Sequence, residues 1–227
     1  MDSAALSELE ERIEGRVLSQ LRAVPVAPGR PLLVVDADEV LVEFAAHLKR
    51  FAATLGIDMH LARYALEGAF RERATGRVLA FDDAIGLIHR FFAEETHAQS
   101  AVPGAAASLA RLSAVAQVVV LTNVPRHARE ARIENLRALG IDYPLVENGG
   151  GKGRPLAWLA ARARAAAAFV DDSPEQIASA ARHASSVTRV HFAGAAYVAD
   201  IIPDCAEAQH RVASWGEAEP VLRRALG

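Results

Sequence analysis

Acidic residues follow two of the apolar runs in this chain, and carboxylates are side chains that can bind metals and carry out acid–base chemistry. Asp36 and Asp38 come directly after the run at residues 31–35, and Asp171 and Asp172 close another run at residues 166–170. Burying a carboxylate costs free energy unless a cation or hydrogen-bond donors compensate. These two acidic pairs therefore predict a site that also contains a cation and basic groups.

Two further segments supply polar groups of the type that binds phosphate. Thr122 and Asn123 follow an apolar run at residues 115–121, and Lys152 lies in a glycine-rich loop at residues 148–153. In a parallel sheet the carboxyl ends of the strands share one edge, so all these residues can converge there. Several carboxylates, a hydroxyl and an ammonium suit Mg²⁺ together with a phosphoryl group, whose oxygens Thr122 and Lys152 would contact.

The elements that must position these residues are four buried strands separated by helices. The apolar runs at residues 31–35, 115–121, 166–170 and 187–192 are too continuous for half-exposed strands, and helical patterns separate them. Ser173 at an N-cap, with Pro174 and Gln176 in the first turn, begins the helix after the third run. This alternation predicts an α/β fold, a Rossmann-like doubly wound parallel sheet.

The remaining segments are expected to be helical. Residues 4–24 show the spacing of one amphipathic helix, with Ser7 and Glu10 as a capping box. Residues 43–100 suggest a small all-helical cap inserted after the first strand, in which a middle helix is marked by Leu61, Tyr64, Ala65, Leu66 and Ala69. We therefore expect a core formed by residues 1–42 and 101–227, with the N-terminal helix inside 1–24, and a cap at 43–100.

Composition limits the compartment and the partners. The chain has 227 residues and a formal net charge of -3, which does not favour nucleic acid as a partner. A single cysteine, Cys205, excludes an internal disulfide and lacks a plausible histidine partner, so we expect it to be inert. The polar start and the lack of a long apolar run favour a cytoplasmic protein that does not enter a membrane, either a monomer or a homodimer. The frequent use of alanine and arginine suggests a bacterial source.

The motifs together resemble those of the haloacid dehalogenase-like (HAD) superfamily, in its phosphatase-type branch. The similar segments are residues 34–40, residues 119–123, Lys152 and residues 169–174, which occur in the family's order and each follow a strand or a loop. Residues 102–105, after the insert, are also similar to the family's return to its core. The resemblance covers roughly residues 31–200 and implies a helical cap of the C1 type.

The resemblance implies a role for each motif residue. Asp36 would be the nucleophile that forms an aspartyl-phosphate, and Asp38 would be the general acid and then the general base. Mg²⁺ would be bound by the Asp36 side chain, the Asp38 carbonyl and a carboxylate of the fourth motif, where Asp172 is favoured as the ligand and Asp171 as its support. Thr122 and Lys152 would hold the phosphoryl group, with Asn123 nearby.

The predicted function is that of a Mg²⁺-dependent phosphatase acting on a small phosphorylated metabolite such as a sugar phosphate or nucleotide. A phosphomutase, a dehalogenase and a non-catalytic module that binds a phosphorylated ligand remain alternatives. Glu39 departs from the glycine that many family phosphatases carry after the second aspartate, which puts substrate fit in question. Further polar residues could meet an anionic substrate or could simply be solvated, namely Arg63, Arg71, Arg73, Arg126, His127 and Arg129.

Overall fold

A six-stranded parallel sheet forms the centre of the molecule. The computed structural model describes residues 3–227, with side chains from residue 6 onward. The strand order is β5-β4-β1-β6-β7-β8, and every neighbouring pair is parallel. The strands are β1 (Leu32–Val35), β4 (Gln117–Thr122), β5 (Leu145–Glu147), β6 (Ala167–Asp171), β7 (Thr188–Phe192) and β8 (His210–Val212).

The predicted α/β class and the four buried strands are confirmed. The apolar runs become β1, β4, β6 and β7, and all four residues of β1 are fully buried, as both-face coverage of a parallel sheet requires. The two outer strands, β5 and β8, were not expected. Each has only three residues, too few for a hydrophobic pattern to distinguish them from loop.

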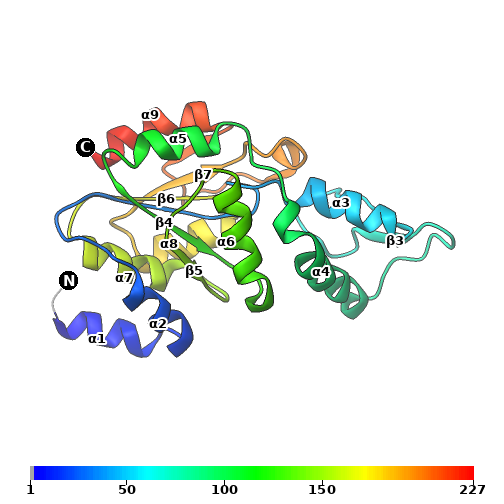
Figure 1. Cartoon of the computed structure of the whole chain (residues 1–227), viewed down its shortest axis with the longest axis horizontal. Helices are drawn as coiled ribbons and strands as arrows, with labels where there is room; N and C mark the ends of the chain where they lie inside the picture. The colour runs from blue at the N-terminus through cyan, green and yellow to red at the C-terminus, as the bar shows by residue number, and fades with distance from the viewer. Residues whose placement is uncertain (1–2) are drawn as a thin grey trace.

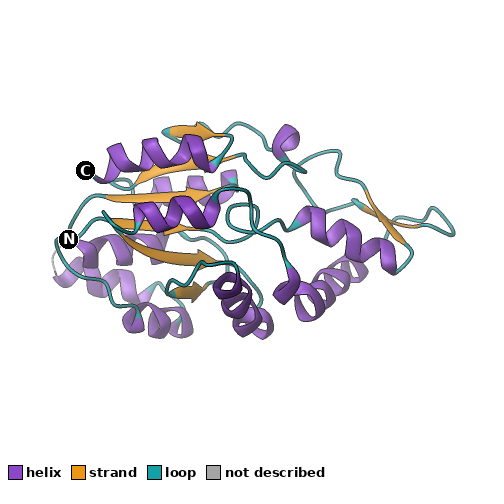
Figure 2. Ribbon diagram, turned by 45° about the horizontal axis from the view of Figure 1, so that its top comes forward, coloured by secondary structure: helices purple, strands orange, loops and turns teal. Residues whose placement is uncertain are grey.

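Helices cover both faces of the sheet (Figures 1 and 2). Leu33 and Val35 of β1 pack with α5, α6 and α9, while Leu32 and Val34 pack with α2, α7 and α8. Successive strand residues point to opposite faces, so one strand contributes to both layers of the core. The helices are α5 (Ala105–Leu112), α6 (Arg129–Ala138), α7 (Gly153–Ala163), α8 (Pro174–His183) and α9 (Trp215–Leu226).

The prediction of one helix over residues 4–24 is wrong, because the segment forms two helices. They are α1 (Ser3–Glu11) and α2 (Gly15–Ala23), and the chain turns between them. Val17 and Leu21 of α2 are buried in the core, against the layer that contains α7. Ser7 lies inside α1, so Ser7 and Glu10 do not form a capping box at its start.

The insert at residues 43–100 extends beyond the carboxyl edge of the sheet (Figure 1). It contains α3 (Ala45–Thr54), a short ribbon of β2 (Ile57–Met59) and β3 (Phe70–Glu72), α4 (Phe81–Glu95) and the 3₁₀ turn η1 (Thr96–Ala98). The ribbon is antiparallel, with Ile57 opposite Glu72. The expected cap is therefore not all-helical.

The middle helix predicted for the insert does not form, and its residues lie in the loop between β2 and β3. Gly56, before this segment, and Gly68, near its end, have φ values of 72° and 71°, a left-handed conformation that interrupts a right-handed helix. The apolar side chains Leu61, Tyr64, Ala65 and Leu66 line a cavity instead of one face of a helix. The spacing of these apolar residues along the sequence therefore indicates that they are directed inward, but not that they form a helix.

The two connections between insert and core run side by side. Val42 forms an antiparallel bridge with Ala101, and the Glu43 N–H donates to the Ser100 carbonyl at 2.9 Å. This pairing brings the two connecting segments together beside the end of β1. The division of the chain into a core and a cap at residues 42 and 101 remains a prediction. No helix in the described part of the chain has the length and apolar character needed to cross a bilayer.

Candidate active site

Three buried carboxylates meet at the carboxyl edge of the sheet. Asp36 follows β1, Asp171 ends β6 and Asp172 comes next, and one oxygen from each lies within 4.8 Å of the others. Val35 of β1 is in register with Val170 of β6, so the acids that follow emerge at the same level. Acids that are 135 residues apart in the sequence therefore share one small site.

Lys152 is the cation of this cluster and one of only two lysines in the chain. Its Nζ lies 2.7 Å from Asp36 Oδ1 and 2.7 Å from Asp171 Oδ2, and its side chain is buried. Burial disfavours the ammonium, but Asp171 and Asp36 together raise the pKa of Lys152 above its ordinary value. Lys152 is therefore charged and held between two of the three acids.

The position of Lys152 depends on close packing between α7 and α8. Its backbone N–H donates to Gln176 Oε1 at 2.8 Å, and the next N–H, of Gly153, donates to Ser179 Oγ at 3.1 Å. A Cβ atom at Gly153 would lie 2.1 Å from the Ser179 carbonyl oxygen, closer than any real contact. Glycine is required here because the start of α7 lies directly against the backbone of α8.

The two acids of the fourth motif have different surroundings. Asp171 uses Oδ2 for Lys152 and accepts the Ser173 N–H on Oδ1 at 2.9 Å, so both of its oxygens have protein partners. Asp172 Oδ2 accepts a hydrogen bond from the Tyr64 hydroxyl of the insert. Ser173 is the N-cap predicted from the sequence, since its side chain accepts from the Gln176 N–H. This arrangement favours Asp172 over Asp171 as a direct metal ligand.

His191, on β7, supports the backbone of Asp172. Its Nε2 lies 2.9 Å from the Asp172 carbonyl oxygen, and Arg211 Nη1 lies 3.3 Å from its Nδ1. A carbonyl can only accept and a guanidinium can only donate, so the proton is on Nε2 and the ring is neutral. Burial, assisted by Arg211, lowers the pKa of His191, which agrees with the neutral form.

The charge balance of the cluster fits a divalent cation. Three carboxylates face one ammonium, which leaves two negative charges in excess when all the acids are ionised. Burial raises the pKa of Asp171 to about 7 despite Lys152, and burial, with Asp36 and Glu39, raises the pKa of Asp172 well above its ordinary value. Hard oxygen ligands with uncompensated charge are the donor set that Mg²⁺ prefers.

Asp38 lies beside the cluster and is paired with a buried arginine. Arg132 Nη2, from α6, donates to Asp38 Oδ1 at 2.6 Å and to Gln99 Oε1 at 2.8 Å. Burial raises the pKa of Asp38, and the Arg132 guanidinium opposes that shift. Asn135, one turn later on α6, donates to the Gln99 carbonyl at 2.8 Å. These contacts fix Asp38 to the segment where the insert rejoins the core.

Thr122 and Asn123 lie at the end of β4, but only the Thr122 side chain is free to hydrogen-bond to a ligand. Thr122 is fully buried, and within the described residues its Oγ1 has no hydrogen-bond partner. An unpaired buried hydroxyl is costly, which suits a group that awaits a ligand. Asn123 is already engaged, because its Nδ2 donates to the Gly150 carbonyl and its Oδ1 accepts from Asn148, both at 2.9 Å. Asn123 thus ties β4 to the glycine-rich loop.

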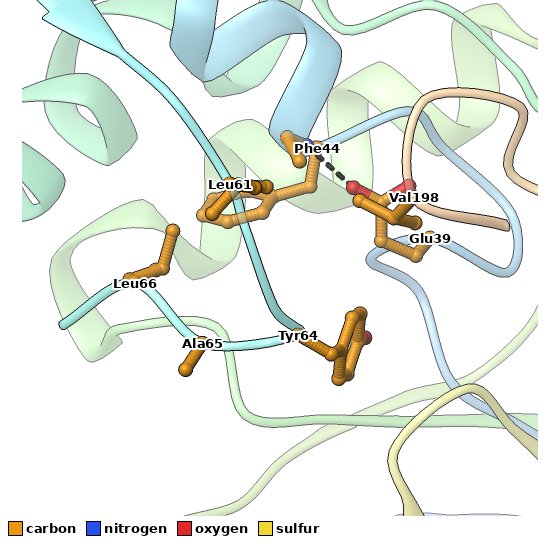
Figure 3. A pocket seen from close by; sticks show the side chains of 8 residues that line it. Glu39, Phe44, Leu61, Tyr64, Ala65, Leu66 and Val198 are labelled. Atoms are coloured by element: carbon orange, nitrogen blue, oxygen red, sulfur yellow. Dashed lines mark hydrogen bonds between the residues drawn. The ribbon is translucent and has the colours of Figure 1, made fainter. Parts of the chain in front are cut away.

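Glu39, which stands where many family phosphatases carry glycine, has an unusual backbone conformation and a side chain that contacts the insert. Its φ is 59°, in the left-handed region where glycine is favoured and glutamate is uncommon. The side chain turns toward the insert and accepts the Ala45 N–H at the start of α3 (Figure 3). A carboxylate at a helix N-terminus offsets unpaired N–H groups there. Burial nevertheless raises the pKa of Glu39 to about 7.

No family model matches the chain, and no curated protein matches it. Solved structures do. A conserved HAD-like protein of unknown function from Agrobacterium tumefaciens superposes with a TM-score of 0.59 at 18% identity, covering 86% of this chain and 99% of that one. A HAD family hydrolase from Deinococcus radiodurans, with bound phosphate and sodium, gives 0.56 at 17% identity, with 88% and 97% covered. A Streptococcus pneumoniae HAD-like hydrolase gives 0.56 at 14%, with 85% and 98% covered.

The chain has the haloacid dehalogenase-like fold. These similarities support the resemblance seen in the sequence, and they concern the fold alone. Within this fold the structure gathers Asp36, Asp171, Asp172 and Lys152 directly, places Asp38 and Thr122 at the same strand edge, and leaves Asn123 exposed beside them.

The other candidate residues are not among the acids and lysine of this cluster, and most of them make contacts of their own. Arg71 Nη1 donates to the Gly76 carbonyl at 3.5 Å, and Arg129 pairs with Glu130. Arg63 pairs with Glu67, Arg73 pairs with Asp58, and His127 Nε2 lies 3.3 Å from the His89 carbonyl, all in exposed contacts. Sequence analysis missed Arg132, His191 and the role of Tyr64. A lone arginine in a helix and a lone histidine in a strand carry no pattern, and only the fold brings them to the acids.

Proposed function

We propose that the protein is a Mg²⁺-dependent phosphatase that hydrolyses a small phosphorylated molecule through an aspartyl-phosphate on Asp36. The observation that carries this proposal is the cluster of Asp36, Asp171 and Asp172 within 4.8 Å, with Lys152 between two of them. An unpaired Thr122 hydroxyl at the same edge supports a bound anion. The cluster has acids to hold a cation and donors to hold phosphate oxygens.

In the proposed reaction, an Asp36 carboxylate oxygen attacks phosphorus, and the bond from phosphorus to the alcohol oxygen breaks. Asp38 gives its proton to the departing alcohol, which keeps the electron pair of the broken bond. Asp38 then takes a proton from water, whose oxygen attacks phosphorus and releases Asp36 and inorganic phosphate. Thr122 and Lys152 would donate to the phosphoryl oxygens in both steps.

Asp36 and Asp172 would hold Mg²⁺ with their side chains, and Asp38 with its backbone carbonyl. The cation, when bound, supplies positive charge that lets an anionic nucleophile approach an anionic phosphate. Asp171 would orient Lys152 and remain outside the metal shell, since both of its oxygens have protein partners.

The fold alone does not select this reaction. Similar structures include an L-2-haloacid dehalogenase from Xanthobacter autotrophicus with chloropropionic acid covalently bound, and others named provisionally as a β-phosphoglucomutase and a phosphoglycolate phosphatase. A dehalogenase would need only the first acid, whereas this chain buries Asp171 and Asp172 beside it. A mutase would use the same acids but return the phosphoryl group to a second hydroxyl.

The test is phosphate release from a panel of phosphate monoesters, with Mg²⁺ and with a chelator present. We expect turnover only with Mg²⁺, and its loss in Asp36→Asn. Asp58→Asn is the matched control, because Asp58 is an exposed acid of the insert that pairs with Arg73. Turnover that survives the chelator would overturn the metal-dependent reaction, and turnover that survives Asp36→Asn would overturn the nucleophile.

A further inference from the structure

A small apolar cavity lies between the insert and the core, next to the acidic cluster. Its volume is about 200 Å³, and Figure 3 shows its lining side chains. Glu39 comes from the loop after β1, Phe44 and Ala45 from the start of α3, and Val198 from the segment after β7. Leu61, Tyr64, Ala65 and Leu66, from the loop between β2 and β3, complete the lining.

Tyr64 and Glu39 connect this cavity to the reacting groups. The Tyr64 ring lines the cavity, and its hydroxyl donates to Asp172 of the cluster. Glu39 is adjacent in sequence to Asp38, the proposed acid. A phosphate ester whose phosphorus faces Asp36 would therefore direct its alcohol part toward this cavity, which is lined by residues of both the insert and the core.

The lining chemistry excludes most polar alcohol groups. Six of the eight lining residues are aliphatic or phenylalanine, and no described side chain in the lining is basic. Glu39 uses an oxygen to accept the Ala45 N–H, and the Tyr64 hydroxyl is occupied by Asp172. Sugar hydroxyls would lose water here and find at most the second Glu39 oxygen as a partner, and a second anion would face a carboxylate and no cation in the lining.

The arginines of the insert do not change this conclusion. Arg63 is paired with Glu67 and Arg73 with Asp58, their side chains are 67% and 55% exposed, and neither lines the cavity. The anion-binding role considered for them in the sequence therefore has no support at this cavity.

From this cavity we infer the substrate class: a phosphate monoester of an uncharged, apolar alcohol whose carbon group is about the size of a benzene ring. An apolar protein cavity of roughly 150 Å³ is known to hold benzene, so a cavity of about 200 Å³ holds a ring with one carbon attached. This inference rests on the proposed function. It replaces the sugar phosphates and nucleotides expected from the sequence with aryl-alkyl or branched alkyl phosphates.

The experiment compares kcat/KM for benzyl phosphate with that for glucose 6-phosphate, phosphoglycolate and 2-aminoethyl phosphate, using the full chain with Mg²⁺. All four are esters of primary alcohols, so differences in leaving-group chemistry are small. We expect benzyl phosphate to be preferred by about 100-fold or more, since a single mismatched group in a specificity pocket already changes rates by about 10–200-fold.

Two variants test whether the cavity causes this preference. Leu61→Asn places an amide of similar size in the lining and should lower kcat/KM for benzyl phosphate by about 10-fold or more, mainly through KM. Leu79→Asn is the matched control, because Leu79 is partly buried in the same apolar cluster of the insert but does not line the cavity. The control should keep the benzyl preference.

The outcomes separate this inference from the proposed function. Equal or better turnover of glucose 6-phosphate, phosphoglycolate or 2-aminoethyl phosphate would overturn the substrate class and leave the phosphatase intact. If no ester is hydrolysed, the phosphatase proposal fails, and calorimetry with benzylphosphonate then tests the cavity itself. Binding by the wild type that Leu61→Asn weakens would support the apolar site, and absence of binding would overturn it.

Discussion

Replacing Lys152 with methionine should destabilise the protein strongly in the absence of metal. The substitution keeps an unbranched side chain, one atom shorter, and removes an ammonium that lies 2.7 Å from Asp36 and 2.7 Å from Asp171. Removing one partner from a fully buried ion pair leaves an uncompensated charge and typically costs about 3–5 kcal/mol. For a domain of this size, that loss lowers the melting temperature by roughly 6–20 °C.

The assay is urea unfolding in a chelating buffer at two pH values. The loss of unfolding free energy caused by Lys152→Met should be largest at about pH 8. It should be smaller at about pH 5, because burial raises the pKa of Asp171 to about 7 and this acid is then already mostly protonated. Lys49→Met is the control, because the other lysine of the chain is exposed and lies 4.9 Å from the Tyr197 ring. If Lys152→Met costs no more than Lys49→Met at the higher pH, Lys152 does not neutralise the acids.

Four further results are expected. In metal-free buffer, raising the pH from about 4 to about 7 should lower the free energy of unfolding by up to about 4 kcal/mol. The reason is that Asp171, with a pKa of about 7 in the folded protein, keeps its proton at pH values where the unfolded chain has lost it. Mg²⁺ should raise the melting temperature more at about pH 8 than at about pH 5, because a metal binds the ionised carboxylates. Arg132→Met should lower kcat about 10- to 100-fold with little change in KM, because Asp38 loses the donor that positions it. Gly153→Ala should cost about 1–3 kcal/mol in urea unfolding, because its Cβ would meet the Ser179 carbonyl.

Three of these results have a matched comparison. Asp171→Asn removes the titrating carboxyl, so an equal fall of stability with pH in this variant and in the wild type would argue against Asp171 as its source. Arg137→Met removes an exposed arginine from the same helix and should leave kcat unchanged, so an equal loss in both variants would argue against a specific role for Arg132. Gly149→Ala adds a methyl group where no atom lies within 4 Å and should be tolerated.

The cluster of acids could be predicted from the sequence because its members follow apolar runs directly. Asp36 and Asp171 each come at the end of a buried strand, and parallel strands deliver their ends to one edge of the sheet. Ser173 was predictable as an N-cap for a local reason, since its side chain bonds to an N–H three residues later. For these residues, the preference of serine for helix N-caps and the convergence of parallel strand ends at one edge of the sheet were sufficient.

The insert and the supporting residues could not be predicted in this way. The apolar residues from Leu61 to Ala69 have helical spacing, but glycines at 56 and 68 with positive φ and the pairing of β2 with β3 override it. Arg132 reaches Asp38 across 94 positions of sequence, and Tyr64 reaches Asp172 across 108. The first contact depends on how α6 packs beside the end of β1, and the second depends on how the insert lies over the core. No local pattern encodes either arrangement.

The central claim, that Asp36 and Asp172 hold one divalent cation at the sheet edge, is tested most directly by diffraction from crystals soaked in Mn²⁺ as a substitute for Mg²⁺. Anomalous difference maps should show a single strong peak within coordination distance of Asp36 and Asp172, with Lys152 and Thr122 facing the adjoining space. A peak elsewhere on the molecule, or none at this cluster when Mn²⁺ supports turnover in solution, would contradict the account.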